Sequence, residues 1–141
     1  MSHYADTHWE RYTGPRLYVD LTGQHPVATA TTAIVLDGGS ATTWTVPRDG
    51  FYHCFAYHRC TTAGTGVSYI TCVSTDKVTG QTVTQTLTDN CSWTLNFEGG
   101  PVSTQPAPLF LAEGSTITFN IVTSGCDTNS VYEVHLLVRV V

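Results

Sequence analysis

The chain has 141 residues, enough for one domain with a single hydrophobic core. Charged residues make up only 12% of it and hydrophobic residues 41%, so hydroxyl, amide and apolar groups must cover much of the surface. The net charge of -5 and the lack of any Lys/Arg run exclude a nucleic-acid groove or an anionic-membrane patch, because both need clustered positive charge.

Residues 1–15 form a polar and aromatic segment, which we expect to be an arm ahead of a single domain at residues 16–141. This start lacks the apolar core of a secretory signal, and no window approaches the ~20 apolar residues of a membrane span, so we expect synthesis and retention in the cytosol. The arm is predicted to dock on a neighbouring subunit or a larger assembly, or to fold back on its own domain. Its candidate contact residues are His3, His8, Trp9 and Tyr12.

The remaining sequence predicts an all-β protein. Threonine and valine are frequent and no stretch keeps apolar residues at spacings of three and four, so little helix is expected. Apolar runs recur between Gly, Pro and Asp turn signals, which is typical of a sandwich or a barrel. The predicted strands cover residues 16–21, 27–35, 42–46, 51–60, 67–75, 81–88, 93–97, 109–111, 115–124 and 131–141.

The strand at 51–60 departs from the pattern of one apolar face. Phe51, Phe55 and Tyr57 share one side, while Tyr52 and Cys54 lie on the other, so both faces suit burial. A strand in a two-sheet sandwich has one face on the core, so the second face needs a cover. Other subunits are predicted to supply it, and a long loop of the same chain is the alternative.

The strand at 81–88, QTVTQTLT, predicts one polar face. All its even positions, from Thr82 to Thr88, are threonine, whereas Val83 and Leu87 lie opposite. The threonine face is expected to meet water or a partner, and the other face to meet the core.

Residues 44–57 resemble a family signature. Trp44-Thr-Val-Pro47, then Gly50-Phe-Tyr52 and alternating aromatics, is similar to the Phe-Thr-x-Pro-x-x-Gly-x-Tyr-x-Phe signature of complement-type and tumour-necrosis-factor-type jelly-roll heads. Residues 108–119 and 131–141 resemble later strands of the same heads. Trp44 and Cys54 replace phenylalanines of the signature, and Ser115 replaces the aspartate of a Gly-Asp pair.

The resemblance implies an antiparallel β-sandwich jelly roll of the tumour-necrosis-factor-like (TNF-like) kind, assembled as a homotrimer around its aromatic sheet. The trimer interface that it implies consists of Phe51, His53, Phe55, Tyr57 and Leu137. Similar trimeric heads occur in viral fibre tips, in phage-head decoration proteins and in spore-surface filaments. A leaderless, threonine-rich chain with few charges fits these better than it fits a secreted cytokine.

His53, Cys54, His58 and Cys60 suggest a zinc site, but strand geometry opposes it. A rise of ~3.3 Å per residue places Cys54 and Cys60 about 20 Å apart, and His53 points to the opposite face. A zinc ion with ligands at about 2.0–2.3 Å cannot join them. We therefore predict no metal and no cofactor, with a site formed by His58, Cys60 and Cys72 as a minor alternative.

The five cysteines are an odd number with no CxxC spacing, so a complete disulfide framework is not expected. Single bridges remain open, with Cys60–Cys72 and Cys91–Cys126 as the options, beside buried free thiols. The turn acids are predicted to hydrogen-bond local backbone, and calcium binding stays unassigned. These acids are Asp37, Asp49, Asp76, Asp89 and Asp127.

These observations predict a non-enzymatic structural protein of a virion surface, either a phage head decoration (cement) protein or a fibre head. Its expected partners are two further copies of itself and a capsid or other virion protein. The alternative is a trimeric complement-type or TNF-like head that binds a receptor or a glycan. A cupin-type enzyme is a third hypothesis, but the HxH and distant His pattern is missing, as are the GxSxG, HExxH and P-loop spacings.

Overall fold

The computed structural model describes residues 16–36, 39–93, 98–99 and 106–141, and this part of the chain is built from strands and turns. The strands are β1 (Arg16–Gln24), β2 (Ala30–Ala33), β3 (Thr43–Thr45), β4 (Gly50–Thr62), β5 (Val67–Thr75), β6 (Thr82–Thr86), β7 (Cys91–Ser92), β8 (Glu98–Gly99), β9 (Leu109–Leu111), β10 (Thr116–Ser124) and β11 (Val131–Val140). Within the described ranges, no helix has the length and apolar character needed to cross a membrane.

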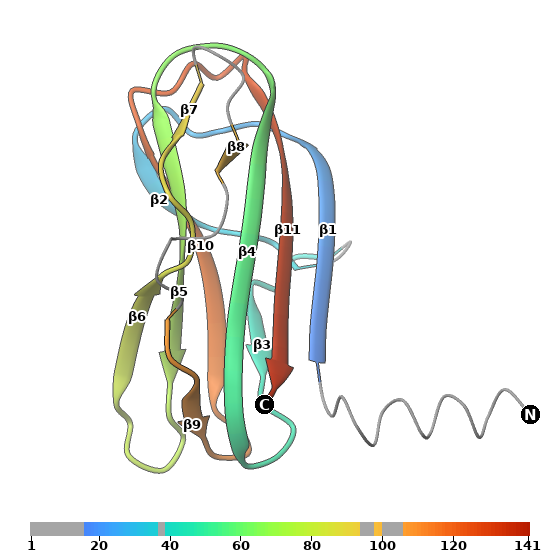
Figure 1. Ribbon diagram of the computed structural model, residues 1–141, viewed down its shortest axis with the longest axis vertical. Helices are drawn as coiled ribbons and strands as arrows, with labels where there is room; N and C mark the ends of the chain where they lie inside the picture. Colours follow the sequence, from blue (N-terminus) through green and yellow to red (C-terminus); the bar gives the residue numbers. More distant parts are fainter. Residues whose placement is uncertain (1–15, 37–38, 94–97, 100–105) are drawn as a thin grey trace, which may run out of the picture.

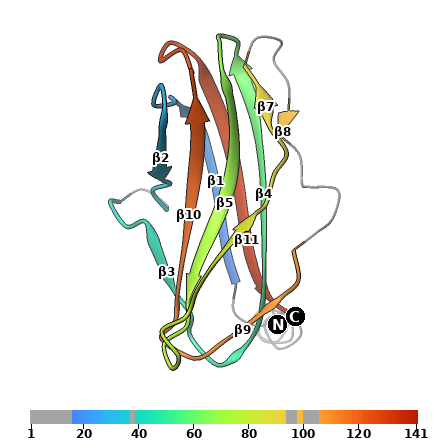
Figure 2. The ribbon, with the colours of Figure 1, turned by 90° about the vertical axis from the view of Figure 1, so that its left-hand side faces the viewer.

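The strands form two antiparallel sheets that face each other (Figure 1 and Figure 2). Sheet A has the order β1-β11-β4, with β8 and β9 both pairing with the far edge of β4. Sheet B has the order β2-β10-β5-β6, with β3 also on β10 and β7 also on β5. The chain crosses between the sheets repeatedly, from β1 to β2, from β3 to β4 and from β4 to β5, as in a jelly roll. The predicted all-β sandwich is confirmed.

The core lies between the sheets because each long strand alternates its side chains. On β4 the even-numbered residues from Tyr52 to Cys60 are buried, and on β11 those from Tyr132 to Val138. Sheet B contributes the largest buried aliphatic and aromatic side chains from β5 and β10, which are Ile70, Ile117, Phe119 and Ile121. The two-faced composition of β4 therefore leaves its odd-numbered residues on the outer side of sheet A.

Two predicted strands differ from the described structure, and a third, at 93–97, lies outside the described residues except for Trp93, which is in a turn. The run at 27–35 forms only the short β2, because side chains replace part of the ladder: Thr123 donates its hydroxyl to Val27 O (2.6 Å) and Thr29 accepts Gly125 N–H (3.0 Å). The run at 81–88 ends its ladder at Thr86, and Thr88 is buried rather than facing water. Its hydroxyl accepts the N–H of Ile70 (2.8 Å), which turns the side chain inward.

All five cysteines are buried free thiols, so neither of the predicted bridges, Cys60–Cys72 and Cys91–Cys126, is formed. The thiols bond to different groups instead: Cys60 Sγ donates to Thr62 O (3.2 Å) and Cys126 Sγ to Val67 O (3.4 Å). Cys72 Sγ donates to Gln85 Oε1 (3.6 Å). The neighbouring Cys72 thiol on the facing sheet, together with burial, raises the pKa of the Cys54 thiol. The cysteines thus behave as small core residues.

A buried polar contact ties the two sheets together near β7. Trp93 Nε1 donates to Ser68 Oγ (2.8 Å), and His58 Nε2 lies 3.0 Å from the same oxygen. His58 comes from sheet A and Ser68 from sheet B, and all three side chains are fully buried. The hydroxyl of Ser68 therefore satisfies the indole N–H in a place that water does not reach.

Replacing this hydroxyl is expected to destabilise the fold. Ser68→Ala leaves the Trp93 indole N–H unsatisfied, so the free energy of unfolding should fall by about 1–3 kcal/mol. Urea unfolding followed by tryptophan fluorescence measures the change. The exposed Ser124 provides the control, since Ser124→Ala should stay within about 0.5 kcal/mol of the unmodified chain. Equal stability of the two variants would contradict the structural role of this contact.

Candidate functional site

The outer side of sheet A gathers the side chains that the alternation of β1, β11, β4 and β9 turns away from the core. We call it the outer aromatic surface. Its central row runs across three strands, because Tyr18 pairs with Leu137 and Leu137 with Phe55. The surface consists of Tyr18, Asp20, Phe51, His53, Phe55, Tyr57, Arg59, Phe110, Glu133, His135, Leu137 and Arg139.

The structure brings all five residues of the predicted trimer interface onto this one surface. Phe51, His53, Phe55 and Tyr57 are the odd-numbered positions of β4, and Leu137 is the register partner of Phe55 on β11. Four of them are half-buried within the single chain, and Phe51 is exposed. Their contact with another subunit stays a prediction.

The middle of the surface is a shallow apolar hollow of about 180 Å³. Tyr18 stands at its rim with 65% of its surface exposed, and Phe55 and Leu137 line it. At one end, Phe51 and Phe110 meet edge to face with ring centroids 5.4 Å apart and remain 55% and 54% exposed. Large apolar side chains contiguous at this level of exposure are characteristic of a surface that another molecule covers.

The apolar centre contains one unsatisfied polar atom. The His53 ring lies against Phe55, with centroids 4.2 Å apart, and the Arg139 guanidinium sits 5.3 Å from the centre of the same Phe55 ring. His53 Nε2 is buried and has no hydrogen-bond partner in the described part of the chain. A buried polar atom without a partner costs free energy, so a donor or acceptor from another molecule would stabilise it.

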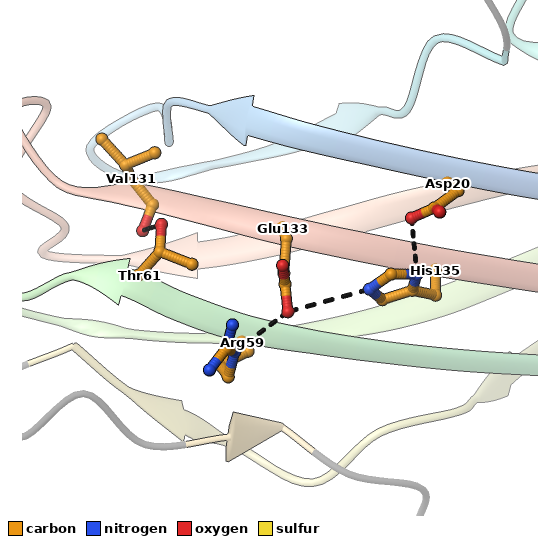
Figure 3. A network of polar contacts seen from close by, with 6 residues as sticks. All are labelled: Asp20, Arg59, Thr61, Val131, Glu133 and His135. Carbon is orange, nitrogen blue, oxygen red and sulfur yellow. Dashed lines mark hydrogen bonds and ion pairs between the residues drawn. The ribbon is translucent and has the colours of Figure 1, made fainter.

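The opposite end of the surface is charged (Figure 3). His135 Nδ1 lies 2.7 Å from Asp20 Oδ1, and its Nε2 lies 3.8 Å from Glu133 Oε1. Arg59 Nε donates to the same Glu133 oxygen at 2.9 Å. This hydrogen bond is the main reason that the pKa of Glu133 is lower than usual. Neighbouring strands β1, β11 and β4 are therefore linked by an alternating row of acids and bases.

The lowered pKa of Glu133 predicts a small acid sensitivity. Because the folded pKa lies below the ordinary value of 4.5, the stabilisation is complete above that pH and is lost as the pH falls through the folded pKa. We expect an effect below about 1 kcal/mol, since the pair lies at the surface. Unfolding midpoints measured from pH 7 downward should fall less steeply in Glu133→Gln than in the unmodified chain, and parallel curves would contradict this role.

Several residues of the surface were absent from the sequence-based prediction. Tyr18 alternates with Leu17 and Val19, and Phe110 stands between two leucines, so period-two alternation was a usable signal for both. His135 and Arg59 give no such signal, because only the strand register places them beside Asp20 and Glu133.

The zinc hypothesis for His53, Cys54, His58 and Cys60 gains no geometric support. His53 points outward while Cys54, His58 and Cys60 lie in the core, and the described residues contain no group of three or more His, Cys, Asp or Glu that could hold a metal ion. The residues of the predicted arm, His3, His8, Trp9 and Tyr12, lie outside the described residues.

No protein-family model matches the chain. No curated protein matches its sequence. Its two-sheet sandwich is found in solved structures of a virus.

These structures come from infectious bursal disease virus. The Gx strain structure has 11% sequence identity and a TM-score of 0.50, with 89% of this chain and 32% of that chain covered. The VP2 subviral particle has 13% identity and a TM-score of 0.51, covering 91% of this chain and 33% of that chain. The T13 viral particle has 14% identity and a TM-score of 0.51, covering 89% and 30%. The chain thus spans about a third of the length of these proteins, and at such identities the similarity shows the fold alone.

Proposed function

We propose that the protein is a non-enzymatic structural component of a virion, which assembles with copies of itself through the outer aromatic surface. The single observation that supports this most strongly is the exposure of Tyr18, Phe51 and Phe110 on one face of sheet A. Covering these rings removes apolar area from water, at about 25 cal/mol per Å². A second copy of the chain presents the same area for burial.

Three copies are proposed because residues 44–57 resemble the signature of heads that form trimers. Around a three-fold axis, the row formed by Tyr18, Leu137 and Phe55 would pack on its symmetry mates. The unsatisfied His53 Nε2 would then lie close to polar groups of the next subunit. The network of Asp20, His135, Glu133 and Arg59 would border the contact as a polar rim.

The virion role is supported by the similarity of the fold to structures of a viral particle, over about nine tenths of this chain. We place the protein on the virion surface, as a decoration (cement) protein or a fibre head. Self-association occupies the outer face of sheet A in this proposal. In this proposal, the N-terminal arm and the loops at the ends of the sandwich contact the capsid protein.

Hydrogen exchange at two protein concentrations tests the proposed contact. Peptides that cover β4 and β11 should exchange more slowly at high concentration, because the strands become covered on their outer side. Peptides from β6, in sheet B, should exchange equally at both concentrations. Protection that appears only in sheet B would contradict the assignment of the surface.

A further inference from the structure

The outer side of sheet B is a neutral surface rich in hydroxyl groups. The side chains that point outward from its strands include no Asp, Glu, Lys or Arg among the described residues. At one end the hydroxyls satisfy each other, with Thr43 to Thr118 at 3.1 Å and Thr75 to Thr82 at 3.0 Å. We call it the threonine surface; it consists of Thr31, Thr43, Thr45, Tyr69, Thr71, Val73, Thr75, Thr82, Thr84, Thr86, Thr116, Thr118, Asn120 and Val122.

The other end of the threonine surface holds a shallow, open cavity of about 290 Å³. Tyr69 of β5, Thr86 of β6 and the following residues Thr88, Asp89 and Asn90 line it. Thr88 is buried and accepts a backbone N–H. The side-chain polar groups of the other four lining residues have no hydrogen-bond partner in the described part of the chain. The cavity therefore combines one aromatic ring with several unused donors and acceptors.

Asp89 differs from the other turn acids in this respect. Asp37 lies outside the described residues. Asp76 and Asp127 each accept a local backbone N–H at 2.8 Å, as expected for turn residues, whereas Asp49 accepts the N–H of the distant Glu113 at 2.7 Å. Such bonds hold the pKa of Asp76 at about 2. Asp89 caps no backbone group in the described residues, which corrects the sequence-based expectation for it. Its carboxylate is left to accept hydrogen bonds from a ligand.

We propose that this cavity binds one ring of a neutral saccharide. The C–H face of a pyranose can pack on the Tyr69 ring, while its hydroxyls donate to the Asp89 carboxylate. The Asn90 amide and the Thr86 hydroxyl can each both donate and accept. Small-molecule sites usually measure about 300–1,000 Å³, so a shallow cavity of about 290 Å³, just below that range, suits a single ring. No lining residue is cationic, so an acidic sugar lacks a counter-charge.

The proposed site is independent of the self-association proposed above. It lies on sheet B, whereas the outer aromatic surface lies on sheet A, so both surfaces can be occupied in the same molecule. Loss of the oligomer should leave saccharide binding by each subunit intact. Each proposal can therefore fail without the other.

Ligand-observed saturation-transfer NMR tests the proposal at any oligomer size. The probes are the methyl glycosides of β-glucose, β-galactose and α-mannose, each at about 10 mM because single-ring contacts bind in the millimolar range. At least one should receive saturation from the aromatic protons of the unmodified chain. Tyr69→Ala should abolish the transfer, and Tyr69→Phe should retain it because the ring remains. Asp89→Asn should weaken binding about tenfold.

Thr45→Ala, at the far end of the threonine surface, is the matched control and should bind as the unmodified chain does. Asp89 is exposed, so Asp89→Asn keeps the test decisive even where Tyr69→Ala does not fold. The proposal is overturned by the absence of transfer to all three glycosides. Transfer that is unchanged in both Tyr69→Ala and Asp89→Asn, or preferential binding of a methyl sialoside, overturns it as well.

Discussion

A Phe55→Asp chain is expected to be monomeric at concentrations at which the unmodified chain associates. Phe55 lies in the central row of the outer aromatic surface, between Leu137 and the His53 ring. The substitution removes apolar area and places a carboxylate in the contact, and around a three-fold axis it would bring three carboxylates together. Loss of a central aromatic residue costs at least about 2 kcal/mol per contact, or roughly 30-fold in affinity.

The control for this variant adds the same charge to the other sheet. Thr84 is exposed on β6, outside both the outer aromatic surface and the proposed saccharide site, so Thr84→Asp should leave the oligomer unchanged. Sedimentation velocity of both variants at matched concentrations gives the comparison, and circular dichroism verifies their folding. A Phe55→Asp oligomer as stable as that of Thr84→Asp would remove Phe55 from the interface.

Gly66→Ala is expected to destabilise the fold strongly. Gly66 has a φ of +93°, and a Cβ added there would lie 2.6 Å from the backbone of Gly125 and Cys126. Backbone atoms cannot move away as a flexible side chain can, so the loop after β4 and the loop after β10 would have to separate. The carbonyl of Gly66 also accepts the backbone N–H of Trp93 at 3.0 Å. Together, the left-handed backbone and the overpacking should cost roughly 2–5 kcal/mol.

Gly80 separates the two causes of this loss. It has a similar φ of +72° but nothing within 4 Å of the added Cβ, so Gly80→Ala should cost only the backbone part, about 1–2 kcal/mol. Urea unfolding at 25 °C, followed by tryptophan fluorescence, measures both variants. If they lose the same stability, the close approach of the two loops at Gly66 does not hold.

Much of the fold follows from local periodicity. The predicted strands at 67–75 and 109–111 coincide with β5 and β9, because alternating apolar residues bounded by turn residues define a strand without tertiary information. The run at 27–35 was too long, because hydroxyl groups of Thr29 and Thr123 compete with the ladder there. Thr88 was predicted on the wrong face of its strand. Its hydroxyl accepts the N–H of Ile70, which turns the side chain inward.

The candidate site was predictable only in part. The alternation in β4 assigned Phe51, Phe55 and Tyr57 to one face, and the structure places that face outward. The contribution of β1, β9 and most of β11 depends on cross-strand register, which arises from the packing of the whole sheet. For the same reason, sequence order suggested the wrong cysteine pairs: all five cysteines are free, and the thiol whose neighbourhood raises the pKa of Cys54 is Cys72. Asp89 shows no local sign that distinguishes it from the capping acids.

The solution mass of the purified chain gives the decisive test of self-association through the outer aromatic surface. Light scattering across a concentration series, with and without reductant and chelator, should give about three times the chain mass of 15.3 kDa in every condition. Insensitivity to reductant is expected because the five cysteines are buried free thiols. A mass of 15.3 kDa at all concentrations would contradict self-association and leave the exposed rings of Tyr18, Phe51 and Phe110 to a different partner.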